Sequence, residues 1–306
     1  MLRRLLPYAG IVGVLALSLA VVASCTHGDE ASDGRPMVVT TTIQVGALTR
    51  AVAGDAVDVK TLVRAGQDPH DYEASASDIK AVGDATVVLR QGIGIDAFLD
   101  KAISGSGATN IVTVSTGVPL RKGDDDRGKA EDDPHIWHNP QNDKIMVDNI
   151  ANALAGAVPA SAETFRQNAD AYKTTLDEVD TEIRALIDTL PETDRKIVSN
   201  HDAFGYFIDH YQLTFIGTVI PGTGTGSEAS AKEIAQLEDT IRREGVKAIF
   251  AESSLDPKVA KQIARDTNVK IVDNLYGDSL GDPGSGADTI DGMLLANART
   301  IVDALK

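Results

Sequence analysis

The chain has no means of forming an internal disulfide, because Cys25 is its only cysteine. Its stability must therefore come from packing, and the residues beyond the first 36 are enough to bury one or two hydrophobic cores. Basic residues are also scarce, since 29 Lys and Arg stand against 45 Asp and Glu and give a formal net charge of −16. An acidic surface disfavours nucleic acid as a partner and favours local enrichment of cations.

The N-terminus is typical of a targeting segment. Two arginines precede an uncharged run, residues 5–24, which ends in small residues directly before Cys25. This order is that of a signal peptide, and cleavage before a cysteine resembles the lipobox of bacterial lipoproteins. We therefore expect a signal peptide at 1–24, then lipidated Cys25 at the head of a flexible tether over 25–36. An uncleaved transmembrane anchor is the alternative, since the run is nearly long enough to span a bilayer.

Two blocks of alternating strand and helix patterns follow the tether. Short β-branched or period-two runs predict strands, and the segments between them predict helices. Such alternation indicates an α/β fold with parallel sheets. The expected strands cover residues 37–42, 57–63, 86–89 and 111–114, then 196–199, 213–220, 247–251 and 269–273.

One helical stretch separates the two blocks. Residues 161–190 contain neither glycine nor proline, and Pro191 closes the stretch. Its length favours a rigid connector between two lobes. We therefore expect an N-terminal lobe at 37–159, a linking helix at 160–191 and a C-terminal lobe at 192–306.

Four side chains form a candidate metal site. The tripeptide Asp-Pro-His occurs twice, ending at His70 and His135, and the other candidates are His201 and Asp278. Imidazole and carboxylate are usual ligands for divalent transition metals. Each candidate follows the carboxyl end of an expected strand, the edge where open α/β sheets bind ligands. If the lobes face each other, the four groups meet in the cleft between them.

Neighbouring residues are candidates for supporting roles. Asp68, Asp133 and Asp202 flank the histidines, and Glu252 ends a central strand, so each could accept the second ring N–H of a ligating histidine. Capping of the loop is the simpler role for the aspartates. His138 lies three residues after His135, and we expect it outside the ligand set.

The sequence lacks two motifs that would point to a function other than metal binding. It contains no His-Glu-x-x-His, although three histidines and an aspartate could hold a catalytic zinc with an open position for water. The glycine-rich segment at residues 222–226 lacks the lysine of a phosphate-binding loop, so we interpret it as a loop of the cleft.

Taken in order, the motifs resemble those of the metal-receptor lipoproteins of zinc and manganese ABC importers, the cluster A-I solute-binding proteins. The resemblance runs from about Met37 to the C-terminus. Its segments are Asp68–Glu73, Asp133–Trp137, His201–Phe207, Ser227–Ile234, Ala251–Ser254 and Tyr276–Leu280.

The resemblance implies two (β/α)4 lobes joined by one rigid helix, with a metal ion between the lobes. The ligands it implies are His70, His135, His201 and Asp278. A histidine at the third position favours Zn2+, because manganese-selective members often carry glutamate there, while Mn2+ remains the alternative. The loop at 121–132 lacks the histidines that many zinc receptors carry in it, which weakens the preference for zinc.

The function implied is capture without catalysis. Such a lipoprotein is anchored through Cys25 on the extracytoplasmic face of a bacterial cell membrane, as a monomer, and delivers its metal ion to the transmembrane permease of an ABC importer. A zinc-dependent hydrolase and a surface adhesin are the alternatives.

Overall fold

The computed structural model describes residues 34–125 and 128–306. The predicted signal peptide, Cys25 and nearly all of the tether lie outside the described residues. Residues 35–306 form one compact unit. Among the described residues, no helix is both long and apolar enough to cross a membrane.

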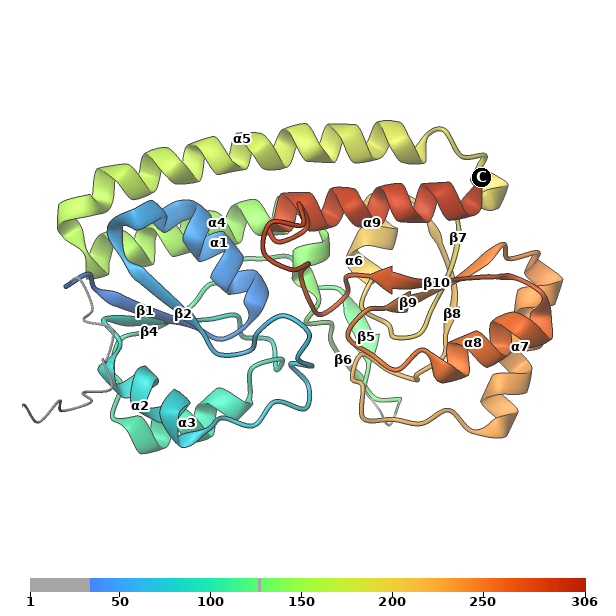
Figure 1. The fold of residues 1–306 in the computed structure, drawn as a ribbon, viewed down its shortest axis with the longest axis horizontal. Coiled ribbons are helices and arrows are strands. Elements are labelled where there is room, and N and C mark those ends of the chain that lie inside the picture. The colour runs from blue at the N-terminus through green and yellow to red at the C-terminus, as the bar shows by residue number, and fades with distance from the viewer. Residues whose placement is uncertain (1–33, 126–127) are drawn as a thin grey trace, which may run out of the picture. The chain divides into compact units, whose positions relative to one another are not determined.

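The N-terminal lobe is built on a four-stranded parallel sheet in the order β2-β1-β3-β4. Its strands are β1 (Met37–Thr40), β2 (Asp58–Thr61), β3 (Val87–Arg90) and β4 (Ile111–Thr113). Figure 1 shows α1 and α4 on one side of this sheet and α2 and α3 on the other. These helices are α1 (Ile43–Ala53), α2 (Ala76–Asp84), α3 (Phe98–Ser106) and α4 (Pro140–Ala157).

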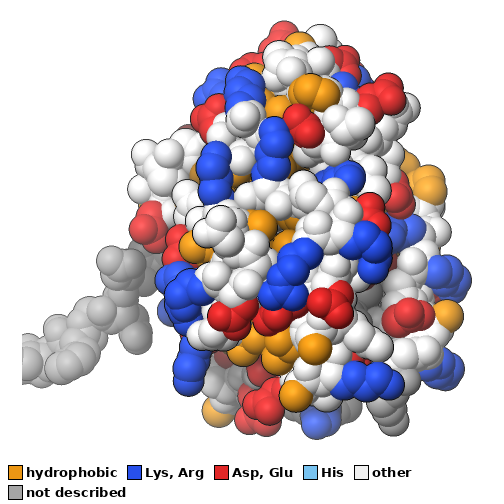
Figure 2. All heavy atoms as spheres, turned by 90° about the vertical axis from the view of Figure 1, so that its right-hand side faces the viewer, with side chains coloured by type: hydrophobic (Ala, Val, Ile, Leu, Met, Phe, Trp, Pro, Cys, Tyr) orange, Lys and Arg blue, Asp and Glu red, His pale blue; other side chains and the backbone are white. Residues whose placement is uncertain are grey.

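The C-terminal lobe repeats the plan with the order β10-β9-β7-β8, again all parallel. Its strands are β7 (Lys196–Ser199), β8 (Thr214–Thr218), β9 (Ala248–Glu252) and β10 (Lys270–Leu275), and its helices are α6 (Gly205–His210), α7 (Ala231–Glu244), α8 (Lys258–Thr267) and α9 (Ile290–Leu305). Ser230 and Glu233 form a reciprocal capping box that begins α7. Figure 2 views this end of the molecule and shows acidic and basic side chains interspersed, with scattered hydrophobic ones.

The two lobes share α5 (Ala162–Ile187), a helix of 26 residues that runs along both in Figure 1. Its buried stripe includes Phe165, Leu176 and Ile183. Polar side chains also fasten it, because Asn168 donates to the carbonyl of Val52 on α1 at 3.0 Å and Tyr172 donates to Asp291 on α9 at 2.7 Å. The predicted fold, two parallel α/β lobes with a single long helix, is confirmed.

The hydrophobic core explains why the lobes behave as one unit. The largest cluster of buried apolar side chains draws on both lobes and on α5, including Trp137, Met146, Leu176, Phe207 and Leu294. Smaller clusters lie beneath α2 and α3 and beneath α7 and α8. The helical layer therefore joins the lobes, and the carboxyl ends of both sheets are left to form the site.

Some local structure differs from expectation. The charged segment at residues 121–132, expected as a loop, contains an antiparallel hairpin of β5 (Lys122–Asp124) and β6 (Ala130–Asp132). Its strands carry charges in place of an apolar alternation, and a Lys122–Asp132 ion pair of 2.6 Å links them across the ladder. The residues that the structure describes also include four short 3-10 turns: η1 (Gly54–Ala56), η2 (Ile136–His138), η3 (Pro159–Ser161) and η4 (Glu192–Asp194).

Candidate metal centre

Four loops bring the predicted residues together. His70 lies between β2 and α2, His135 between β6 and η2, His201 just after β7 and Asp278 just after β10. Each offers one ligand atom, and these four atoms all lie within 4.8 Å of one another. His135, His201 and Asp278 are buried, whereas the His70 side chain keeps 15% of its surface exposed.

The spacing of the ligand atoms suits a small tetrahedral ion. The Nε2 atoms of His70 and His135 are 3.3 Å apart, and the Asp278 carboxylate lies 3.4 Å from the first and 3.3 Å from the second. Its Oδ2 is 3.6 Å from Nδ1 of His201. Ligands bonded to zinc at about 2.0–2.2 Å in a tetrahedron are separated by about 3.3–3.6 Å, and the distances among His70, His135 and Asp278 match that spacing.

Asp133 contacts the ring nitrogen of His135 that faces away from the cluster. One carboxylate oxygen of Asp133 lies 2.8 Å from Nδ1 of His135 and accepts the backbone N–H of the same residue at 2.9 Å. The other oxygen accepts from Arg121 at 2.7 Å. With Nδ1–H donated to Asp133, Nε2 is the ring nitrogen that faces the cluster, and loss of its proton gives the lone pair that a ligand needs.

The His201 imidazole contacts protein groups at both ring nitrogens. Its Nδ1 lies 2.9 Å from Oε1 of Glu252, and its Nε2 lies 3.0 Å from the carbonyl oxygen of Thr223, in the glycine-rich loop. A proton on each nitrogen would satisfy both contacts. Ligation by His201 therefore requires that one of these contacts be given up.

The Asp278 carboxylate has the environment of a metal ligand. It is buried, and among the described residues its oxygens have imidazole nitrogens at 3.3–3.6 Å but no well-aligned hydrogen bond. Its backbone N–H donates to Oε2 of Glu252 at 3.0 Å, so Glu252 supports both His201 and Asp278. A buried carboxylate without hydrogen-bond donors is costly unless a cation or a charged partner faces it.

The imidazoles and carboxylates of the site shift one another's pKa values. Burial lowers the pKa of His201, but Glu252 and Asp278 overcome this and raise the pKa to about 9. Burial likewise opposes charge on His135, and Asp278 and Asp133 raise its pKa well above the usual value. Burial would raise the pKa of Asp278, yet the two imidazoles hold it well below the usual range. These opposite shifts show that the imidazoles and the Asp278 carboxylate each stabilise the charged form of the other.

Two of the four acidic residues expected to orient imidazoles act differently. Asp68 accepts the backbone N–H of His70 at 2.8 Å and the hydroxyl of Thr225 at 2.6 Å. It therefore links the His70 loop to the glycine-rich loop, and these contacts do not involve the His70 ring. Asp202 cannot take a ring N–H of His201, because Glu252 and the Thr223 carbonyl already contact both ring nitrogens. Asp133 and Glu252 have the expected contacts.

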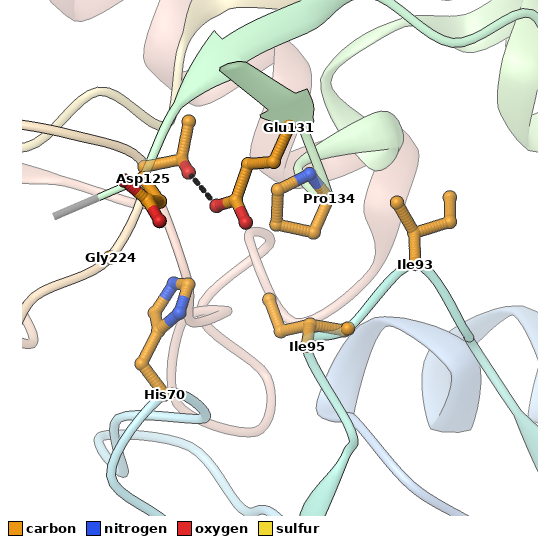
Figure 3. Close-up of a pocket in the computed structure, with 9 residues that line it drawn as sticks. His70, Ile93, Ile95, Asp125, Glu131, Pro134 and Gly224 are labelled. Carbon is orange, nitrogen blue, oxygen red and sulfur yellow. Dashed lines mark hydrogen bonds between the residues drawn. The ribbon is translucent and has the colours of Figure 1, made fainter. Parts of the chain in front are cut away.

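A cavity of about 310 Å³ opens beside His70. Figure 3 shows the His70 ring pointing into it, with Asp125 and Glu131 of the hairpin region across from the ring. Oε1 of Glu131 accepts the Thr223 hydroxyl at 2.7 Å, so the hairpin and the glycine-rich loop form one wall. The sequence did not indicate that the charged hairpin lines the site, because a run of charged residues is usually a solvent-exposed surface.

Comparisons with known proteins agree on one family. A family model described as zinc-uptake complex component A, periplasmic, matches residues 38–304. The chain is 30% identical to the manganese ABC transporter substrate-binding lipoprotein PsaA of Streptococcus mitis, over 97% of this chain and 98% of that protein. It is 33% identical to the zinc-binding protein TroA of Treponema pallidum, over 94% and 96% of the two chains.

Solved structures of this kind have the same fold. The periplasmic zinc-binding protein TroA from Treponema pallidum superposes with a TM-score of 0.82 at 32% identity, covering 89% of this chain and 99% of that one. A manganese-bound periplasmic metal-binding protein from Candidatus Liberibacter asiaticus gives a TM-score of 0.79 at 26% identity, covering 89% and 100%.

Proposed function

Because this chain belongs to the periplasmic zinc-uptake component A family, we propose that it holds its metal ion with His70, His135, His201 and Asp278. The protein is an extracytoplasmic metal receptor that captures a divalent ion and delivers it to an ABC permease. The observation that carries the ligand assignment is the convergence of these four side chains, from four loops and both lobes, within 4.8 Å.

We propose zinc as the preferred cargo and manganese as the second. Three imidazoles and one carboxylate form a nitrogen-rich set of four, which suits tetrahedral zinc. Manganese favours more oxygen ligands, and only a bidentate Asp278 could supply a second one here. Both Asp278 oxygens lie within 3.6 Å of imidazole nitrogens, so bidentate binding needs only a small rotation of the carboxylate. Relatives of both kinds, zinc and manganese receptors, match this chain.

The related proteins are named as metal-uptake and transporter substrate-binding components. In this chain, four protein ligands around one ion would leave no position for a reacting water, and three of the four are buried. That arrangement supports capture without catalysis. Neither the hydrolase nor the adhesin alternative gains support from the named relatives.

The ion would enter on the side of His70, the one partly exposed member of the cluster. The cavity there is bounded by the carboxylates of Asp125 and Glu131, which attract cations. His70 would meet the ion first, and the buried His135, His201 and Asp278 would then replace its remaining water.

Several relatives are named as lipoproteins. For this chain we propose removal of residues 1–24, lipid on Cys25 and a tether to residue 36, which together hold a monomeric receptor at the outer face of the membrane. The N-terminal lobe at 37–159 and the C-terminal lobe at 192–306, joined by 160–191, would then approach the permease from outside.

The proposal is tested on the full chain purified without added metal. We expect one bound zinc per chain, and we expect zinc to displace manganese in a competition titration. His201→Ala should lose tight zinc binding because it removes one of four ligands. His210→Ala is the matched control, since His210 lies at the end of α6 and contacts Asp180 at 2.9 Å outside the cluster. Tight zinc binding by His201→Ala, or two tight zinc ions per chain, would contradict the proposed site.

A further inference from the structure

The peptide unit between Gly277 and Asp278 is held at both ends. Its carbonyl oxygen accepts two hydrogen bonds, from Nε1–H of Trp137 at 2.9 Å and from Nε2–H of His138 at 3.1 Å. Its N–H donates to Glu252 at 3.0 Å. The two donors belong to η2 in the N-terminal lobe, whereas the peptide and Glu252 belong to the C-terminal lobe. Hydrogen bonds from both lobes therefore fix the orientation of the peptide plane to which Asp278 is attached.

The His138 ring is neutral and has one free nitrogen. It is buried, packs against Phe204 at a centroid distance of 4.9 Å, and burial lowers its pKa to about 3. A carbonyl oxygen can only accept, so the ring proton is on Nε2. Its Nδ1 has no hydrogen-bond partner among the described residues. An apolar residue would fill this place without a buried unpartnered nitrogen, so the donor at Nε2 is the feature that distinguishes histidine here.

Gly277 has no room for a side chain. A Cβ atom built on it would lie 1.9 Å from Oε2 of Glu252, so the Glu252 carboxylate presses against the glycine itself. Glu252 also contacts His201 at 2.9 Å. The peptide is thus confined between Glu252 on one side and the Trp137 and His138 donors on the other. Rotation of this peptide would swing the Asp278 carboxylate away from His70 and His135.

We infer that Trp137 and His138 are positioning residues for metal capture, which hold Asp278 at the ion through the Gly277 carbonyl. They lie two and three residues after His135 in the sequence, so one short segment supplies a ligand and also orients the ligand from the opposite lobe. This inference rests on the proposed function, because it assumes that Asp278 binds the ion.

The test compares zinc affinities of variants, with zinc chloride as the probe and a chelating indicator as competitor. His138→Leu removes the donor while keeping an apolar side chain of similar size, and we expect it to weaken zinc binding about 5-fold, the effect of one lost hydrogen bond. His138→Gln replaces the donor and should recover most of the loss. Trp137→Phe, which removes the other donor, should weaken binding to a similar degree. His210→Leu is the control histidine and should leave the affinity unchanged.

A second set of variants separates positioning from general structure. In an Asp278→Ala background the carboxylate is gone, so His138→Leu should cause no further loss of affinity. An equal loss in both backgrounds, or no loss in either, overturns the inference. If His138→Leu does not fold, as judged by thermal unfolding without metal, Trp137→Phe in the same two backgrounds decides. If Asp278→Ala alone leaves zinc affinity unchanged, the proposed ligand set fails before the positioning role is tested.

Discussion

Zinc affinity should depend steeply on pH, because the metal replaces protons at the site. Without metal, His201 has a pKa of about 9 and the pKa of His135 is raised well above its usual value. Both rings are therefore protonated at neutral pH, and only the neutral rings bind zinc. Affinity should rise with pH up to about 9 and level off only above the raised pKa values.

The magnitude follows from the number of protons displaced. Each displaced proton makes the dissociation constant change about 10-fold per pH unit, so two protons give about 100-fold per unit. Between pH 6 and pH 8 the affinity should thus improve by roughly 10⁴-fold. Unperturbed histidines, which lose their protons near pH 6.5, would give almost no change between pH 7.5 and 8.5.

Two measurements test the predicted pH dependence and the number of protons displaced. Competition with an indicator of known pH dependence gives the affinity at each pH, and mixing zinc with protein in a weakly buffered solution at pH 7.5 gives the protons released directly. We expect close to two protons per zinc. Glu252→Gln removes the charge that raises the pKa of His201, so this variant should release fewer protons at the same pH. Fewer than one proton released by the unsubstituted chain would refute the assignment of charged imidazoles to the metal-free site.

Three further predictions address the same region. Gly277→Ala should lower both the unfolding temperature and the zinc affinity, because its Cβ would meet Glu252 at 1.9 Å; unchanged values in calorimetry and titration would contradict the packing. Metal-free protein should lose stability as pH rises from about 6.5 through about 9, since the raised pKa of His201 stabilises the fold only while the ring is protonated; a denaturant series over this range tests the sign. Trp137 lies edge-on to His135 at 5.4 Å, so its fluorescence should change on zinc addition, and a change that survives in His201→Ala would mean that the signal does not report the four-ligand site.

The sequence was enough to predict where the strands lie and which side chains are the candidate ligands. Buried parallel strands are short apolar runs bounded by turns, and the loops that follow their carboxyl ends meet at one edge of a sheet. His201 and Asp278 could therefore be placed near each other without knowledge of their contacts. Glu252, at the end of a central strand, could be associated with the site for the same reason.

The missed features depend on contacts between segments with no shared pattern. The hairpin of β5 and β6 is held by backbone pairing and an ion pair between charged residues, so it lacks the apolar alternation of a strand. The contacts of Trp137 and His138 end on a backbone carbonyl about 140 residues away, which no side-chain pattern reveals. Asp68 was expected to orient an imidazole, but in a tight loop its short side chain reaches the backbone N–H two residues on.

The most direct test of a single site shared by both lobes is the location of the ion itself. Crystals of the zinc-loaded chain, measured with X-rays at the zinc absorption edge, would show it by anomalous scattering. We predict one ion per chain, bonded at about 2.0–2.2 Å to one atom from each of His70, His135, His201 and Asp278. An ion outside this cluster, or one whose coordination omits the residues of either lobe, would contradict the account.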